Sequence, residues 1–498
     1  LVSWWQLGEN MSFVGSGAQG SGGTEWIVLD EKGSNNGTGA NLAPAEDAIV
    51  NGVGTSGNGL SDGMGGADNI IGDAPYSTAN AVSYGMGVDA RVKNGEIFQP
   101  FQMQFEVASG VSKTITILGV NGASFYIDWG DGFTETNTGS NNRLVSHTYN
   151  DGTYNDVTNP TVSIGSESDT GPLSRLKFRG GSGPELLDIK NWGQSKWTNF
   201  ADAFRTCNNP AFQISATNTP DLSLLTAPNT SYFSTMFYQS TINSSNLINW
   251  DVSNVQKFNS MFYGASQFNQ DISGWDVSSA TSMLSLFKSA PNFNQDISGW
   301  DVSNVSVFQE MFYNASSFNQ DISSWDVSSA TTMFQMFRSA SSFNQDISGW
   351  NTSLVTNMER VFQAASQFNQ NLNSWNVSNV TNMLAMFWQA SNFNQNLSDW
   401  QITSLSNARL VFNSSAMTTE NYTDTIVGWA VYVYNNSGTP SSVNMTSNSK
   451  TFDGTRTSDY ASGQTYATKY GSNWTATGWS DAQDAFDYLT TTLSWTIN

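Results

Sequence analysis

The sequence predicts a multidomain α+β protein in which a β-rich N-terminal part precedes an α/β solenoid of 25-residue units with a C-terminal cap. The chain has 498 residues, which is more than one domain usually holds. Apolar and polar residues alternate over residues 100–183, a pattern typical of half-buried strands. Tryptophan recurs every 25 residues from Trp250 to Trp400. A strict period of this length indicates one supersecondary unit that is repeated and stacked.

Residues 1–98 are rich in Gly, Ala, Asn and Ser and have no strong periodicity. We expect a β segment or a docking arm that folds against neighbouring subunits. The sequence Ser-Trp-Trp-Gln-Leu at residues 3–7 and Gly-Ser-Asn-Asn-Gly-Thr at 33–38 resemble the opening of laminin-G-like jelly rolls and fragments of phage structural proteins. The segment is too short for a complete jelly roll.

Residues 99–183 are expected to form a β-sandwich, because residues 113–118 and 124–128 alternate in polarity. The motif Asp-Trp-Gly-Asp-Gly at 128–132, followed by His-Thr-Tyr at 147–149, resembles the signature of polycystic-kidney-disease (PKD) domains. The resemblance implies that Trp129 anchors the core and that the domain acts as a spacer on a surface protein.

Residues 184–249 are interpreted as degenerate entry repeats and residues 250–413 as the regular array. In one unit Val305, Phe308, Met311 and Phe312 follow the spacing of one helix face, and residues 296–302 have the composition of a short strand with turns. Each unit is therefore predicted to hold one helix and one short strand, which bury their apolar faces by stacking. The tryptophans expected to be structural are Trp275, Trp300, Trp325, Trp350 and Trp375.

The repeat Met-Phe-Tyr-Gly-Ala-Ser-Gln-Phe-Asn-Gln-Asp-Ile-Ser-Gly-Trp-Asp-Val at residues 261–277 resembles the repeat of BspA-like leucine-rich-repeat surface proteins of bacteria. The resemblance implies a leucine-rich-repeat-like solenoid, displayed outside the cell for adhesion or host-surface contact, without catalysis. Residues 421–430 resemble the closing segment of that family, so residues 414–498 are interpreted as a cap. Residues 431–480 are a Ser/Thr/Asn/Gly-rich insertion in this cap, which Trp495 and Ile497 are expected to complete.

The charge excludes some classes of partner. The chain carries 41 acidic and 19 basic residues, a formal net charge of −22, and no cluster of Lys and Arg. Binding to nucleic acid or to an anionic membrane depends on such clusters, so neither is expected. No apolar run approaches the ~20 residues of a membrane span. Cys207 is the single cysteine, so no intrachain disulfide can form.

Aspartates recur at one position of successive units and suggest a possible metal site. They are Asp271, Asp296, Asp321 and Asp346. Calcium is the cation that stacked carboxylates would bind. The favoured alternative is that each carboxylate accepts a backbone N–H in a turn, because later units carry Asn at this position. Asp128 and Asp131, in a Gly-rich turn, leave the same two interpretations open. No other cofactor is expected.

One position, directly after a fixed Phe, varies from unit to unit within an otherwise constant frame. It is occupied by Tyr238, Tyr263, Lys288, Tyr313, Arg338, Gln363 and Trp388. Variation there indicates exposure, and aromatic and Arg residues are enriched at interfaces. We expect this position to contact a protein or glycan on a host or neighbouring surface, or other subunits of an assembly. The alternative is a tolerant helix surface.

These observations favour a non-enzymatic extracellular surface or structural protein, located on a cell surface or a virion surface. The alternative is a virion structural protein of a bacteriophage, either a capsid decoration or a fibre. A polysaccharide-active enzyme is the third class, but no active site of such an enzyme is visible in the sequence. His147 is the single histidine, and no paired nucleophile motif accompanies it.

Overall fold

The computed structural model describes residues 99–120, 124–138, 143–166, 177–178, 185–194, 197, 199–222, 233–437, 439–446, 450–459 and 462–497. Among residues 1–98 it describes only six short strands. These are β1 (Met11–Val14), β2 (Trp26–Asp30), β3 (Gly37–Gly39), β4 (Val82–Tyr84), β5 (Val88–Lys93) and β6 (Glu96–Phe98). They pair antiparallel in the orders β1-β2-β3 and β4-β5-β6. The rest of the predicted docking arm lies outside the described residues.

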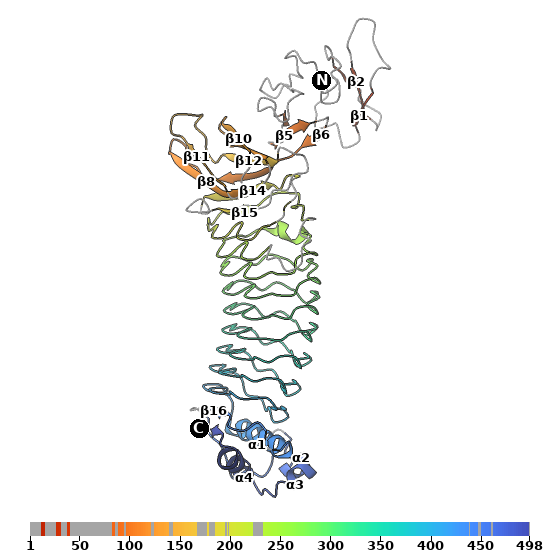
Figure 1. Ribbon diagram of the computed structural model, residues 1–498, viewed down its shortest axis with the longest axis vertical. Helices are drawn as coiled ribbons and strands as arrows, with labels where there is room; N and C mark the ends of the chain where they lie inside the picture. The colour runs from red at the N-terminus through yellow and green to blue at the C-terminus, as the bar shows by residue number, and fades with distance from the viewer. Residues whose placement is uncertain are drawn as a thin grey trace.

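Strands between residues 101 and 214 form two sheets (Figure 1) that share a buried core. The larger sheet has the order β10 (Thr134–Thr138), β9 (Ser124–Asp128), β12 (Thr161–Ser166), β7 (Phe101–Phe105), β14 (Leu186–Asn191) and β15 (Gln213–Ile214). The smaller sheet has the order β11 (Arg143–Tyr149), β8 (Lys113–Val120) and β13 (Lys177–Phe178). Alternate residues such as Ile115, Ile117 and Ile127 point into the core and are fully buried, as the polarity alternation predicts.

The sheet continues directly into the repeat region through β14. This strand pairs antiparallel with β7 and parallel with the two-residue strand β15. After β14 the chain makes one circuit and returns as β15 beside it. Because β14 belongs to the sheet and to the first circuit at once, backbone hydrogen bonds join the sandwich to the repeats.

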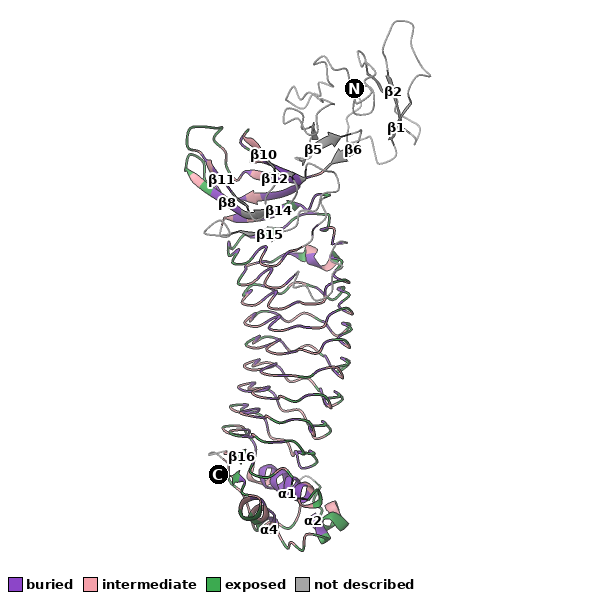
Figure 2. Ribbon diagram, in the orientation of Figure 1, coloured by how far each residue is buried: buried purple, intermediate pink, exposed green. Residues whose placement is uncertain are grey.

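The repeats form a stack of 25-residue coils that extends away from the sheets (Figure 1). Parallel bridges join equivalent residues of successive coils in a row that ends in the cap. The row is Lys257, Ser282, Val307, Thr332, Asn357, Asn382, Asn407 and Asn444. Figure 2 shows that buried residues recur along every coil of this stack.

Aromatic rings continue from coil to coil in the core. The centroids of Phe262 and Phe287 are 5.8 Å apart with nearly parallel rings, and those of Trp275 and Trp300 are 6.4 Å apart. The indole N–H of Trp300 donates to the carbonyl oxygen of Ile272 in the preceding coil at 3.1 Å. Each Trp therefore contributes burial and a hydrogen bond that joins two coils.

The predicted helix is wrong. Residues 305–308 form a link that contains the bridge residue Val307, and residues 309–312 lie in turns. Residues 296–302, predicted as a strand, form one turn with links on either side. Val305, Phe308, Met311 and Phe312 are nonetheless all fully buried. The apolar spacing predicted which side chains enter the core, but it did not predict the backbone that places them there.

Backbone hydrogen bonding explains why no helix forms. The N–H of Glu310 donates to the carbonyl oxygen of Phe334 in the next coil at 2.9 Å, whereas the N–H of Met311 closes a local turn onto Phe308 at 3.1 Å. Local bonds and bonds to the next coil thus alternate along the segment. Glu310 has φ 56° and Asn314 has φ 58°, left-handed values that interrupt a right-handed helix.

The C-terminal cap covers the last coil with α1 (Thr419–Asn435). Trp429 on α1 stacks on Trp400 with centroids 6.3 Å apart, and its indole N–H donates to Leu397 O at 2.9 Å, so α1 continues the Trp row. A Cβ on Gly428 would lie 2.2 Å from Ser398 O, so α1 can approach the coil this closely only with glycine there. α1 is buried along most of its length (Figure 2).

The remaining elements complete the cap. β16 (Asn444–Met445) continues the bridge row of the coils and pairs in parallel with β17 (Thr496–Ile497). The other elements are α2 (Tyr466–Tyr470), α3 (Ser472–Thr475), α4 (Ala482–Asp487) and the one-turn π-helix η4 (Tyr488–Thr492). A 3-10 turn, η3 (Ser245–Asn249), precedes the regular coils. Within the described residues no helix combines the length and the apolar character needed to cross a membrane.

Candidate functional site

The variable position of each coil lies on one side of the stack, where its side chains contact one another along the stack axis. Arg205 lies over the ring of Tyr238 at 4.6 Å, and Tyr238 stacks on Tyr263 at 4.6 Å. Lys288 lies between Tyr263 and Tyr313, at 5.3 and 4.8 Å from their ring centroids. We call these residues, together with Arg338, the aromatic–cation row.

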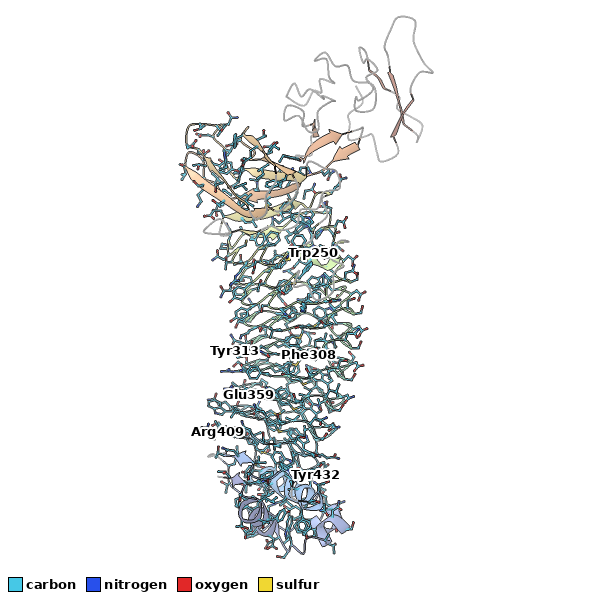
Figure 3. The ribbon with its side chains drawn as sticks, viewed as in Figure 1. Trp250, Phe308, Tyr313, Glu359, Arg409 and Tyr432 are labelled. Carbon is cyan, nitrogen blue, oxygen red and sulfur yellow. The ribbon has the colours of Figure 1, made fainter. Side chains whose placement is uncertain are left out.

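The row continues beyond Tyr313, which Figure 3 labels at the side of the stack. Arg338 lies 5.0 Å from the Tyr313 ring centroid. Gln363 follows and is buried, and its side-chain oxygen has no hydrogen-bond partner among the described residues. Trp388, the next member, is half-buried.

The row is chemically a series of cation–π and ring–ring contacts. Because neighbours in the row occupy the faces of Tyr263 and Tyr313, a ligand would meet the ring edges, hydroxyl groups and cationic heads. Lys288 also forms an ion pair with Glu310 at 2.9 Å, so part of its charge is neutralised. Arg205 and Glu310 were not predicted as members of this site, although Arg205 follows a Phe just as the other members of the row do.

The repeated aspartates each accept a hydrogen bond from the backbone N–H two residues later. Asp296 Oδ1 accepts from Ser298 N at 2.9 Å, and Asp321 and Asp346 do the same with their own serines. These bonds lower the pKa of all three carboxyl groups below the ordinary value. The carboxylates are exposed, and the described residues include no group of three or more His, Cys, Asp and Glu side chains that could hold a metal ion.

Asp128 and Asp131 make different contacts within their turn. Asp128 Oδ1 accepts from Gly130 N at 2.9 Å. Asp131 is buried, accepts from Phe133 N at 3.1 Å and contacts His147 Nε2 through its other oxygen at 2.6 Å. The structure thus brings together Asp131 and His147, a pairing that the sequence analysis missed.

Aromatic rings enclose the Asp131–His147 pair. Trp129 and Phe133 stack on the two sides of the imidazole, each with its centroid 5.1 Å away. The hydroxyl of Tyr149 donates to Trp129 O at 2.8 Å, and burial raises the pKa of this phenol. The motif residues therefore hold the turn of the sandwich together, and their polar atoms point at one another.

Asparagine side chains form a row of hydrogen bonds along the stack, which the sequence alone did not predict. Asn319 Oδ1 accepts the backbone N–H of Asn344 in the next coil at 2.9 Å and the side-chain amide of Gln345 at 3.0 Å. The same contacts recur from coil to coil, and we call this the asparagine row. Its members are Asn269, Asn294, Asn319, Asn344, Asn369 and Asn394. The fixed Phe-Asn-Gln triplet was the signal that could have revealed it.

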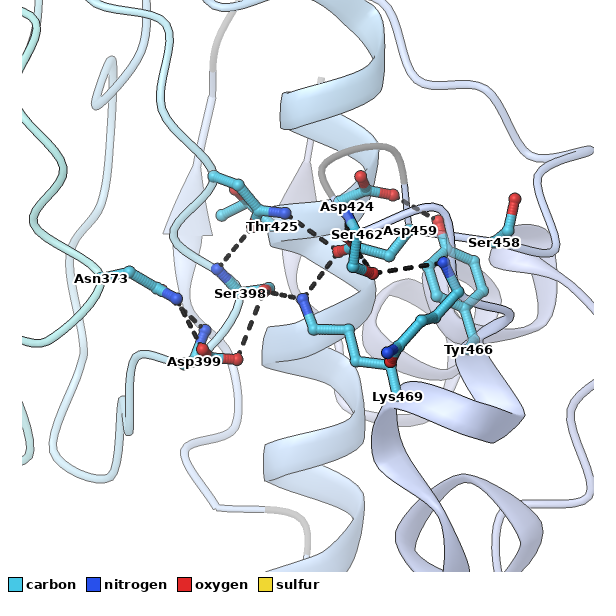
Figure 4. A network of polar contacts seen from close by, with 12 residues as sticks. Asn373, Ser398, Asp399, Asp424, Thr425, Ser458, Asp459, Ser462, Tyr466 and Lys469 are labelled. Atoms are coloured by element: carbon cyan, nitrogen blue, oxygen red, sulfur yellow. Dashed lines mark hydrogen bonds and ion pairs between the residues drawn. The ribbon is translucent and has the colours of Figure 1, made fainter.

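Charged side chains also gather where the cap meets the last coil (Figure 4). Asp424 on α1 is fully buried and accepts from the Tyr466 hydroxyl at 2.7 Å. Asp459 Oδ2 lies 2.6 Å from Lys469 Nζ, which also donates to Ser398 Oγ at 2.7 Å. Ser398 belongs to the last coil, whereas Asp424, Asp459 and Lys469 belong to no repeat, so no sequence pattern indicated that they would meet.

The comparisons with known proteins concern the coil stack. Residues 231–348 and 320–425 match the family model described as "Mycoplasma protein of unknown function, DUF285". No curated protein and no solved structure matches the chain. The matched region begins after the first circuit, at residue 231, and runs into α1, which is consistent with a BspA-like surface repeat protein.

Proposed function

We propose that this protein is a non-enzymatic extracellular surface protein whose coil stack is displayed for adhesion. The observation that carries the proposal is the match of the whole regular stack to a repeat family that is consistent with surface proteins. The elongated form of the stack supports it (Figure 1), because a rod places its sides away from the point of attachment.

Both ends of the stack are covered, so its sides are the surfaces that remain for a partner. The β14–β15 pairing joins one end to the sandwich, and α1 with β16 covers the other. On one side the aromatic–cation row and Trp388 present Tyr, Arg, Lys and Trp side chains, types that often supply binding energy at interfaces. We therefore assign partner contact, with a protein or a glycan, to this side.

Location is tested first, by immunogold electron microscopy on the native source with an antibody raised against residues 250–413. Label on the cell envelope is the expected result. Label on regular particles would instead make the protein a virion component, either a capsid decoration or a fibre.

Binding is tested with the full chain on arrays of glycans and extracellular-matrix proteins. We expect Trp388→Ala together with Tyr313→Phe to lower retention at least ~10-fold, since each removes a group at the proposed contact. Leu354→Ala is the matched control, because Leu354 is 52% exposed and lies outside the row. Equal retention of all variants would place the contact elsewhere. Sugar release from a glycan panel would contradict the non-enzymatic assignment.

A further inference from the structure

Three side chains of complementary reactivity meet where the cap closes on the last coil: Asn396, Asp459 and Lys469. Asn396 lies in the last regular coil, Asp459 in the loop before α2, and Lys469 on α2. Figure 4 shows Asp459 and Lys469 beside Ser398 and next to α1.

One carboxylate oxygen connects the amine and the amide. Asp459 Oδ2 lies 2.6 Å from Lys469 Nζ and 3.0 Å from Asn396 Nδ2. The other oxygen, Oδ1, accepts from the backbone N–H and the hydroxyl of Ser462 at 2.8 and 2.9 Å, which fixes the orientation of the carboxylate. Oδ2 can therefore exchange protons with both nitrogen atoms without a change of rotamer.

The amide oxygen of Asn396 makes the same turn hydrogen bond as its counterparts in the other coils. Asn396 Oδ1 accepts from the backbone N–H of Ser398 at 2.9 Å. A donor in this position stabilises the negative charge that develops on the oxygen when a nucleophile adds to Cγ. Ser398 Oγ also accepts from Lys469 Nζ at 2.7 Å, so the same residue positions the amine.

Asn396 is more buried than the residues at the same position of the other coils. Asp271, Asp296, Asp321, Asp346 and Asn371 occupy the same position and are exposed, whereas the cap makes Asn396 half-buried. The side chain of Asp459 is 1% exposed and that of Lys469 is 18% exposed. Burial raises the pKa of Asp459, but the hydrogen bonds from Lys469 and Ser462 lower it below the ordinary value, so the side chain is a carboxylate that can accept a proton.

We propose that Lys469 and Asn396 form an intramolecular isopeptide bond, with Asp459 as the proton carrier. Asp459 accepts a proton from the Lys469 ammonium group, and the neutral amine attacks Cγ of Asn396. The Nζ–Cγ bond forms and the Cγ–Nδ2 bond breaks, while Asp459 delivers a proton to the departing nitrogen. Ammonia leaves and carries the surplus lysine proton as ammonium, so no oxidant or further reactant is needed.

The bond would tie the cap covalently to the end of the stack. The chain has one cysteine and therefore no disulfide within it. The reaction requires that the cap be folded, because only then does Asp459 contact both Lys469 and Asn396.

The test is the intact mass of the purified full chain after folding, followed by fragmentation of its tryptic peptides. The expected mass is lower than that of the sequence by one ammonia, and the peptide containing Asn396 is joined to the one containing Lys469. A mass equal to that of the sequence would overturn the proposal. Loss of water instead would overturn it too, because Asp459 would then be the electrophile.

Variants separate this reaction from ammonia loss elsewhere in the chain. Lys469→Arg keeps a cation beside Asp459 but removes the nucleophile, and Asp459→Asn removes the proton carrier, so both should retain the full mass. Lys450→Arg is the matched control, because Lys450 donates to the carbonyl oxygens of Ser415 and Met417 rather than to a carboxylate. Circular dichroism checks that each variant is folded. Ammonia loss that persists in folded Lys469→Arg would contradict the assignment.

Discussion

Many polar side chains in this protein form hydrogen bonds between successive coils. In the asparagine row Asn319 receives a backbone N–H from the next coil and offers its own N–H to Asn294 in the previous one. In the regular coils the indole N–H of each Trp from Trp275 to Trp400 likewise reaches the preceding coil, as that of Trp325 does at 3.0 Å. A polar atom that bonds to a neighbouring coil is shielded from water on formation of the stack, so its loss leaves a partner unsatisfied.

The asparagine row gives the first prediction. Asn319→Ala should lower the free energy of unfolding by about 1 to 3 kcal/mol, because the N–H of Asn344 and the amide of Gln345 each lose an acceptor. Chemical denaturation measures this. The neighbouring exposed Ser317→Ala is the control and should change the value by less than about 0.5 kcal/mol. Equal effects of the two substitutions would show that the row contributes nothing specific.

The repeated aspartates give a prediction about pH. Hydrogen bonds from the serine two residues later lower the pKa of Asp276, Asp296, Asp321, Asp326 and Asp346 in the folded chain. Their stabilisation is therefore present above the unfolded pKa, about 3.9, and is lost as pH falls through the lower folded values. The thermal midpoint should be nearly constant from about pH 7 to 5 and then fall.

The variant that tests this prediction replaces these five aspartates by Asn. Asn keeps the hydrogen-bond acceptor but has no carboxyl group that can be protonated. Asn already serves in this way at position 371, where Oδ1 accepts from Asn373 N at 2.9 Å. We expect a shallower fall of the thermal midpoint between about pH 4 and 2, measured by circular dichroism. Identical slopes for the two proteins would assign the acid sensitivity to other carboxyl groups.

At the scale of elements, the repeat unit is a series of turns that the neighbouring coils hold in place. Residues at two positions of each coil adopt left-handed φ, and most of them are not glycine. For a residue with a Cβ this conformation costs roughly 1 to 2 kcal/mol. The cost is tolerated because the N–H groups at these positions bond to the next coil, as that of Ser285 does to Gln309 at 2.9 Å.

A glycine substitution distinguishes this backbone from the helix that the apolar spacing predicts. Ala385 lies within the predicted helix but has φ 55°. In a helix Ala→Gly costs about 1 kcal/mol. Here relief of the left-handed strain offsets the lost methyl group and the added chain entropy, so Ala385→Gly should destabilise by less than about 0.5 kcal/mol.

The control for this substitution lies in the same coil. Ala390 is also fully buried, but its φ is not positive, so Ala390→Gly should cost at least about 1 kcal/mol. Urea denaturation of both variants makes the comparison. A larger loss for Ala385→Gly than for Ala390→Gly would contradict the turn structure.

At the scale of the whole molecule, the sandwich and the cap close the two ends of the coil stack. An uncovered coil would present unpaired backbone groups and apolar side chains, as an exposed sheet edge does. At the C-terminal end the N–H of Ala408 donates to Asn444 O at 2.8 Å, and Trp429 covers Trp400. The cap is therefore needed for solubility as well as for stability.

Truncation tests this requirement. A chain that ends at residue 415 should form larger species than the full chain at equal concentration, because Ala408 and the Trp400 ring lose their cover. Size-exclusion chromatography with light scattering measures this. Removal of residues 1–98, which leaves both closed ends in place, is the control and should not produce such species. A truncated chain of unchanged size would show that the last coil protects itself.

The period, the residues that fill the core and the variable position of each unit can be predicted from the sequence alone. These three features follow from local composition, because each unit repeats the same apolar residues. The spacing of Val305, Phe308, Met311 and Phe312 predicted their burial, and all four are fully buried. The alternation of residues 113–118 likewise predicted a half-buried strand, and β8 lies there.

The backbone of the repeats and the partners of the polar groups depend on contacts that form only in the folded chain. A helix and a series of turns can bury the same apolar side chains, and the choice depends on hydrogen bonds to coils 25 residues away, as between Glu310 and Phe334. The cluster of Asn396, Asp459 and Lys469 joins residues up to 73 positions apart across the boundary between the repeats and the cap. No local pattern records such contacts, because they form only when the cap packs onto the last coil.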